Sequence, residues 1–212
     1  MEYRKLGKTE LNISAIGLGT WAFNSLVYGP VEKSAALKTI RTAIDEGINF
    51  FDTAPLYGNK ENDGIAETIL GEGLNGFRKK VIISSKFGRK PTEGNRADFS
   101  AQSARTCVDE SLKRLKTDYL DILFFHSPFS PNEIQDDVWR ELERLKKAGI
   151  IRFVGHSISM FEKTEQMARE WAEQRRIDVI QVVYSLLFRH SEDLICNLGE
   201  KNIGIVARES LA

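Results

Sequence analysis

An amphipathic helical segment followed by a short apolar segment recurs six times along the 212 residues. In the first unit, residues 34–46 place apolar side chains at helical spacing, Gly47 follows as the expected C-cap, and residues 48–52 are expected to form a strand. An earlier apolar segment, AIGLGTW, adds a further strand, so the sequence predicts seven strands and six helices. The other predicted helices cover residues 64–74, 100–115, 132–148, 161–171 and 191–200.

Strands separated by helices of this length form β-α-β units and therefore a parallel sheet. The strand segments are apolar on both faces, as expected where helices cover a sheet. Ahead of the first strand, YRKLGKTELNIS predicts a β-hairpin that turns at Gly7 and Lys8. No linker or low-complexity tract interrupts the chain, which favours one domain over residues 1–212.

Two α/β architectures fit this pattern: an open doubly wound sheet and a (β/α)8 barrel of the TIM type. A doubly wound nucleotide binder carries G-x-G-x-x-G after its first strand, whereas this chain has GLGTWAFNS, without the third glycine. Strand carboxyl ends meet at one mouth in a barrel, and polar side chains there favour that architecture. The polar residues at predicted strand ends are Asp52, Lys86, His126, His156, Gln181 and Arg208.

Composition excludes several classes of protein. The 30 basic and 30 acidic side chains cancel, which argues against a nucleic-acid partner. No apolar run is long enough to cross a bilayer, and the charged N-terminus is unlike a secretory signal. The two cysteines form no C-x-x-C motif, so a disulfide scaffold is not expected and the predicted location is the cytoplasm.

Four residues at or just after three neighbouring strand ends suggest chemistry: Asp52, Tyr57, Lys86 and His126. Each alone has an ordinary structural explanation, such as capping or packing. Together they form a proton donor to a carbonyl group. An ammonium beside Tyr57 is expected to lower the tyrosine pKa toward neutral pH, and Asp52 to keep Lys86 charged. His126 is expected to orient the carbonyl oxygen by a hydrogen bond, and a bound hydride source is needed for reduction.

The chain resembles the aldo-keto reductase family over essentially its whole length. The motifs that carry the resemblance are GLGTW, FDTAPLYG, SSKFG, DILFFHSP, GIIRFVGHS, QVVYSLL and ARESLA. The resemblance implies a (β/α)8 barrel that reduces an aldehyde or ketone with NADPH (NADH being possible). It implies that Tyr57 is the general acid, that Lys86 and Asp52 tune the pKa of Tyr57, and that His126 orients the carbonyl. The implied reaction uses no metal ion.

The resemblance also implies the residues that surround the cofactor and substrate. Ser157 and Gln181 would bind the nicotinamide carboxamide, and the stretches around Trp21, Phe23, Tyr28 and Phe129 would shape the substrate cavity. The implied cofactor-binding residues are Thr20, Trp21, Asp52, Ser157, Gln181 and Arg208.

Three positions depart from the family pattern. Ile158 stands where relatives usually have Asn, so one carboxamide hydrogen bond is missing or comes from His156 or Gln181. His156 itself replaces a common apolar residue, and a structural role for it is equally expected. Arg208 stands where an aromatic ring often stacks on the nicotinamide, and a planar guanidinium can stack similarly.

The chain ends at Ala212, just after the seventh predicted strand. We interpret it as a truncated member of the family, without the segment that holds the adenosine end of the cofactor in relatives. An open seven-stranded barrel leaves its first and last strands as edges. We therefore expect residues 1–212 to bind NADPH poorly and to aggregate.

Three other functions remain open from sequence. A non-catalytic, cofactor-sensing interaction subunit would have the same fold. A metal-dependent barrel hydrolase could use Asp52, His126 and His156 as ligands. A Schiff-base aldolase could act through Lys86, although Asp52 would oppose the lowered lysine pKa that this requires. Neither the carbonyl substrate nor the oligomeric state follows from the sequence.

Overall fold

A computed structural model describes residues 1–24, 29–159 and 162–211 of the chain. Its main sheet contains seven strands in sequence order, and each neighbouring pair is parallel. Within the described residues β3 and β9 pair on one side only, so they are the sheet's edges. The strands are β3 (Leu18–Gly19), β4 (Phe50–Asp52), β5 (Ile82–Phe87), β6 (Leu120–His126), β7 (Ile151–Ser157), β8 (Val179–Val183) and β9 (Gly204–Arg208).

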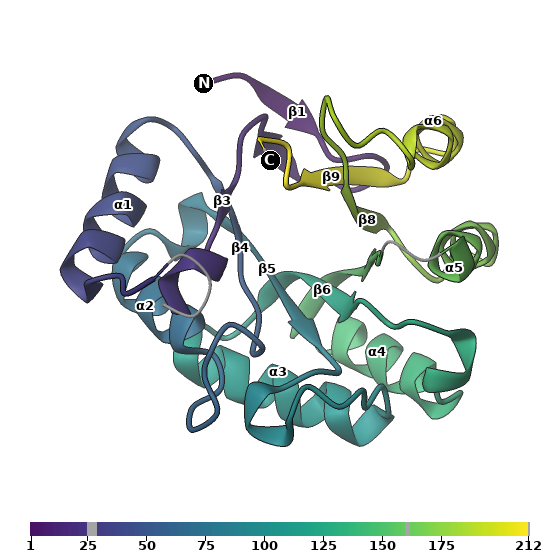
Figure 1. Ribbon diagram of the computed structural model, residues 1–212, viewed down its shortest axis with the longest axis horizontal. Helices are drawn as coiled ribbons and strands as arrows, with labels where there is room; N and C mark the ends of the chain where they lie inside the picture. Colours follow the sequence, from purple (N-terminus) through teal and green to yellow (C-terminus); the bar gives the residue numbers. More distant parts are fainter. Residues whose placement is uncertain (25–28, 160–161, 212) are drawn as a thin grey trace.

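The sheet curls into a half-barrel, and the α-helices lie along its outer, convex side (Figure 1). This arrangement confirms the predicted parallel α/β fold, with a helix between successive strands from β3 to β9. The helices are α1 (Lys33–Asp45), α2 (Ile65–Gly73), α3 (Ala101–Leu115), α4 (Asp137–Lys147), α5 (Glu162–Glu173) and α6 (Glu192–Glu200). None of the described helices combines the length and apolar character needed to span a membrane.

Helix boundaries follow local chemistry. The Ser100 hydroxyl caps α3 by accepting a hydrogen bond from the Ser103 amide at 3.1 Å. Gly47 and Gly149, which follow α1 and α4, have φ values of +84° and +72°, as expected of helix C-terminal glycines.

The helix predicted over residues 132–148 begins later than expected. Residues Pro131–Glu133 form a separate 3₁₀ turn, capped by the Ser130 hydroxyl, and Ile134 is extended. Ile134 pairs with Phe99 in an isolated bridge, so a tertiary contact rather than helical propensity sets the start of α4 at Asp137.

Alternation along the strands creates two apolar layers. Side chains on the convex face, such as Phe51, Ile83 and Phe125, pack with the helices. Side chains on the concave face, such as Phe50 and Phe124, form a second cluster inside the half-barrel. Polar side chains lie instead toward the carboxyl ends of the strands, beyond the apolar part of the concave face.

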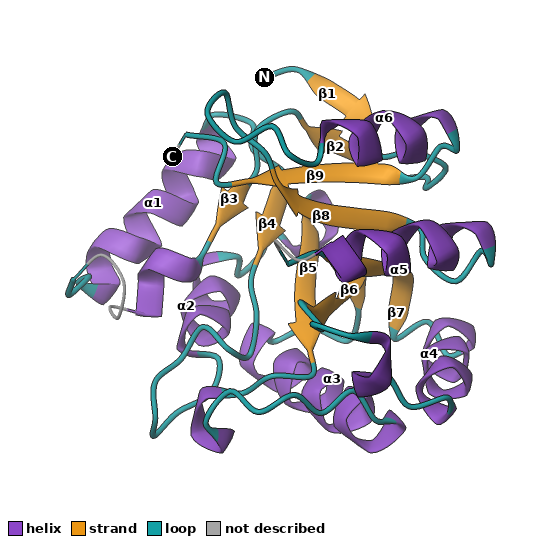
Figure 2. Cartoon of the chain, turned by 45° about the vertical axis from the view of Figure 1, so that its right-hand side comes forward, coloured by secondary structure: helices purple, strands orange, loops and turns teal. Residues whose placement is uncertain are grey.

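The N-terminal hairpin, β1 (Tyr3–Lys5) and β2 (Asn12–Ser14), is antiparallel, as predicted. It lies beside β9 (Figure 2) and contributes leucine and isoleucine side chains to the inner cluster. At its turn Gly7 has a φ of +54°, and a Cβ there would lie 2.3 Å from the Gly204 nitrogen. The hairpin therefore closes the inner cluster at the end of the sheet where the strands begin.

Candidate active site

Lys86 is the centre of the polar cluster at the carboxyl ends of the strands. Its side chain points to the concave face of β5 and is only 1% exposed. The ammonium donates hydrogen bonds to both Asp52 carboxylate oxygens, at 2.9 and 2.7 Å, and to the Thr53 carbonyl at 2.9 Å. It also donates to the Tyr57 hydroxyl at 3.2 Å. A buried ammonium is tolerated here because oxygen atoms surround it.

Asp52, the last residue of β4, is held by residues on both sides. The Ser84 hydroxyl donates to the Asp52 carboxylate at 2.7 Å. The Thr20 amide and hydroxyl donate to the Asp52 carbonyl at 2.9 and 3.0 Å. Thr20, expected near the cofactor, is buried and makes these bonds to Asp52. Ser84 was not predicted, although it lies two residues before Lys86 and therefore on the same face of β5.

Tyr57 lies in the loop after β4, where its carbonyl accepts a hydrogen bond from the Ala66 amide in α2 at 3.0 Å. Its ring meets the His126 ring edge-on, at 6.0 Å between centroids. Burial raises the pKa of Tyr57, although the Lys86 charge acts in the opposite direction. The lowered tyrosine pKa expected from the sequence is therefore wrong for this protein, because burial outweighs the ammonium. Tyr57 stays protonated at neutral pH.

Lys86 stays charged for a complementary reason. Burial lowers its pKa, but the Asp52 carboxylate and the Tyr57 hydroxyl outweigh burial, so the pKa of Lys86 is raised. A Schiff-base mechanism requires a neutral lysine, and this environment opposes it.

His126 ends β6 and is almost completely buried. Burial holds its pKa well below the ordinary range, and the cations Lys86, Arg89 and Arg208 act in the same direction. The imidazole is therefore neutral, with one N–H donor. Its Nδ1 atom is buried and has no hydrogen-bond partner in the part of the chain that the structure describes.

Ser157, the last residue of β7, pairs with Gln181, which lies in the middle of β8 rather than at the strand end expected from the sequence. The Ser157 hydroxyl donates to the Gln181 side-chain oxygen at 3.0 Å. Arg208 ends β9, and one of its nitrogens donates to the Ile158 carbonyl at 3.3 Å. Arg208 lies two residues after Val206, which packs against the inner cluster, so both side chains are on the concave side of β9.

His156 and Ile158 do not face this cluster. His156 lies on the convex side of β7, and its ring centroid is 4.7 Å from that of Trp171. Ile158, directly after β7, joins the outer apolar layer. Burial lowers the pKa of His156 to about 3. His156 therefore cannot supply the expected carboxamide hydrogen bond, and it is not brought together with Asp52 and His126 as a metal site requires. Across the described residues, no three acidic, His or Cys side chains are grouped to hold a metal ion.

Two of the aromatic residues expected at the substrate cavity are exposed, and one of them contacts the cluster. Trp21, 42% exposed, has its ring centroid 6.5 Å from that of Tyr57. Phe129, 46% exposed, follows β6 shortly after His126. Phe23 is buried in the outer apolar layer, so the structure does not place it at a substrate cavity. Tyr28, also expected there, lies outside the described residues.

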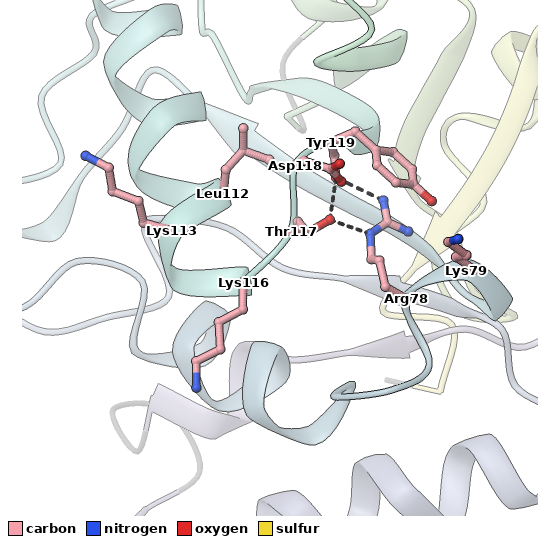
Figure 3. A pocket seen from close by; sticks show the side chains of 8 residues that line it. All are labelled: Arg78, Lys79, Leu112, Lys113, Lys116, Thr117, Asp118 and Tyr119. Atoms are coloured by element: carbon pink, nitrogen blue, oxygen red, sulfur yellow. Dashed lines mark hydrogen bonds between the residues drawn. The ribbon is translucent and has the colours of Figure 1, made fainter.

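A hollow of about 640 Å³ lies at the opposite end of the sheet, where β5 and β6 begin (Figure 3). The Arg78 guanidinium is occupied by hydrogen bonds to Thr117, Tyr119 and Asp121. The Lys113 and Lys116 side chains point away from each other in Figure 3 and do not converge on the hollow. This hollow is therefore separate from the polar cluster.

Comparison with known proteins gives consistent results. The sequence matches the profile of the aldo/keto reductase family over residues 15–212. It is 42% identical over 160 residues to L-galactose dehydrogenase of Arabidopsis thaliana, covering 73% of this chain and 48% of that protein. It is 34% identical over 208 residues to the aldo-keto reductase YhdN of Bacillus subtilis, covering 95% of this chain and 59% of that protein.

The fold comparison agrees. The holo form of an aldo-keto reductase from Bacillus halodurans superposes with a TM-score of 0.85 at 28% identity, over 98% of this chain and 66% of that one. The chain spans about half to two thirds of the length of the curated relatives it matches. The profile match over nearly the whole sequence shows that this chain belongs to the aldo/keto reductase family.

Proposed function

We propose that the chain takes part in the NADPH-dependent reduction of an aldehyde or ketone to an alcohol. The observation that carries the proposal is the Lys86 ammonium, fixed between the Asp52 carboxylate at 2.7 Å and the Tyr57 hydroxyl at 3.2 Å. This arrangement provides a protonated hydroxyl and a cation that stabilises the oxygen once its proton has left.

In the proposed mechanism, a carbonyl oxygen lies within hydrogen-bond reach of the Tyr57 hydroxyl and the neutral His126 ring. His126 orients the oxygen, and Tyr57 donates its proton as negative charge develops there. The resulting phenolate is stabilised by Lys86, whose own charge is maintained by Asp52. NADPH, when bound, supplies the hydride that reaches the carbonyl carbon.

The side chains around the cluster suit a nicotinamide. A carboxamide both donates and accepts hydrogen bonds, and the buried Ser157–Gln181 pair presents a hydroxyl and a primary amide on the concave face of β7 and β8. Arg208 adds a planar cation that can stack on a ring. We propose these three residues and Trp21 as cofactor contacts, with NADH as an alternative cofactor. Thr20 and Asp52 would shape the same site from the end of β4.

The proposed substrate is a small carbonyl compound, and the proposed compartment is the cytoplasm. Trp21, whose ring centroid lies 6.5 Å from that of Tyr57, and the exposed Phe129, which follows His126 by three residues, provide apolar surface for the body of the substrate. The two free cysteines, Cys107 and Cys196, are compatible with a reducing compartment.

The test is transfer of deuterium from NADPH labelled at the nicotinamide C4 position. The chain is incubated with labelled cofactor and a generic aldehyde, and the alcohol is analysed by mass spectrometry. We expect one deuterium on the carbinol carbon. Saturable NADPH binding without alcohol formation would contradict the proposed reaction and support a cofactor-sensing subunit.

A further inference from the structure

Arg89 joins the loop that follows β5 to the loop that follows β6. Its side chain is 10% exposed although it lies in an irregular segment. The guanidinium donates from Nε to the His126 carbonyl at 3.1 Å and from Nη2 to the Ser127 carbonyl at 3.2 Å. Its Nη1 donates to the Asn95 carbonyl within its own loop at 3.0 Å. The guanidinium thus binds the carbonyls of two successive peptides, which lie before and after the Cα of Ser127, directly after His126.

The backbone at that peptide needs support. Ser127 has a φ of +51°, a left-handed conformation that costs a non-glycine residue free energy. The turn directs the chain away from the end of β6 immediately after His126. Its neighbouring carbonyls are those that Arg89 binds, so the guanidinium holds the strained turn in place.

The same guanidinium also contacts the exposed aromatic residue of this loop. The Arg89 guanidinium carbon lies 4.2 Å from the centroid of the Phe129 ring. The Phe129 amide donates to the Glu133 carboxylate at 3.0 Å, and that carboxylate lies 3.5 Å from Arg89 Nη2. One side chain therefore contacts both the backbone of His126 and the ring of Phe129.

We propose that Arg89 is a positioning residue that fixes His126, and with it the Phe129 wall of the substrate site, in the orientation used for carbonyl reduction. The inference rests on the role proposed above for His126. Arg89 acts through backbone carbonyls and does not itself touch the reacting atoms.

Lysine cannot replace arginine in this role. The guanidinium is a planar fork that donates in several fixed directions and stacks flat on an aromatic ring. A lysine ammonium retains the positive charge but cannot reach three carbonyls in two loops at once. Arg89→Lys therefore separates the effect of geometry from the effect of charge.

The first arm of the test needs neither cofactor nor turnover. The chain has three histidines, so the imidazole signals of His126, His156 and His190 can be assigned by single substitutions and followed by NMR. We expect Arg89→Lys to shift or broaden the His126 signals and to leave those of His156 and His190 in place. Arg96→Lys is the matched control, because Arg96 lies in the same loop and is exposed. Unchanged His126 signals in a folded Arg89→Lys protein would overturn the proposal.

The second arm is a double-mutant cycle in kcat, with NADPH and an aldehyde. We expect Arg89→Lys to lower kcat by about tenfold or more, in line with the large cost of small misplacements in active sites. In a His126→Ala background the same substitution should have less than about a twofold effect, because its target is gone. An equal loss in both backgrounds would show a general structural effect and overturn the proposal.

The two arms separate failure of this inference from failure of the proposed function. If the wild-type chain forms no alcohol, the reductase proposal fails, while the NMR arm still decides whether Arg89 fixes His126. Arg89→Lys keeps a positive charge next to Glu133, so it changes the geometry of the contacts without leaving that carboxylate unpaired.

Discussion

The Lys86–Asp52 pair shows how single residues in this site depend on one another. Removing one partner of a buried ion pair leaves an uncompensated charge, which typically costs about 3–5 kcal/mol. Here the pair also has the Thr53 carbonyl and the Ser84 hydroxyl as partners. The same contacts that stabilise the folded chain therefore set the charge next to Tyr57.

The residues of the cluster could be predicted only in part. Strand ends bring Asp52, Lys86 and His126 to one edge of a parallel sheet, and this follows from the sequence pattern alone. Whether the pKa of Tyr57 is raised or lowered overall does not follow from the pattern, because it depends on burial by segments distant in sequence. The support from Arg89 was also missed, because it is directed at backbone carbonyls of another loop and leaves no motif.

His156 leads to a prediction about the pH dependence of stability. In the folded chain its pKa is lowered to about 3 by burial, whereas an unfolded histidine titrates near its ordinary value of about 6.5. Below pH ~6.5 the unfolded chain therefore binds a proton that the folded chain does not. The free energy of unfolding consequently decreases as the pH is lowered. Between pH 7.5 and 5.0 this loss amounts to about 2 kcal/mol.

Urea unfolding of wild type and His156→Leu at the two pH values measures this contribution. The variant should lose about 2 kcal/mol less than wild type on acidification, because other buried groups such as His126 contribute equally to both. His190→Gln is the matched control, since His190 is exposed, and should behave as wild type. Equal losses in wild type and His156→Leu would show that His156 takes up a proton in the folded state.

At the scale of elements, periodicity predicted the order of strands and helices. The 3.6-residue and two-residue patterns alternate clearly, and glycines mark the ends of α1 and α4. The predicted start of α4 at residue 132 is wrong, because Ile134 pairs with Phe99 and the helix begins only at Asp137. No local sequence pattern encodes this contact. Which face of β7 His156 occupies could be derived from alternation once Ser157 was placed at the site.

The register of the sheet explains why functional side chains alternate with apolar ones. His126 pairs with Ser157, and Ser157 pairs with Gln181, so three polar residues align across neighbouring strands. On each of these strands, the residue directly before the polar one points to the opposite face of the sheet, where the helices lie. A shift of one residue in any strand would exchange these two sets.

At the scale of the whole molecule, the hairpin forms part of the interior. Leu11 is buried in the inner cluster with Phe50 and Phe124 from β4 and β6. We predict that Leu11→Ala lowers the free energy of unfolding by about 2–4 kcal/mol, because the cavity cannot fully collapse. Urea unfolding measures the loss.

Leu186→Ala is the matched control for this substitution. Leu186 is 91% exposed, so its truncation should change stability by less than about 0.5 kcal/mol. If Leu11→Ala were as mild as Leu186→Ala, the hairpin would not be part of the cooperative core. The two leucines together thus test whether the inner cluster continues from the sheet into the hairpin.

The central claim is that the Tyr57 hydroxyl donates the proton to the carbonyl. The most direct measurement compares wild type and Tyr57→Phe in a single turnover with an aldehyde, with NADPH affinity measured separately by nicotinamide fluorescence. The account predicts a rate lowered about 10²–10⁴-fold, the range for loss of a general acid, with cofactor affinity nearly unchanged. A variant that reduces the aldehyde at the wild-type rate would contradict it.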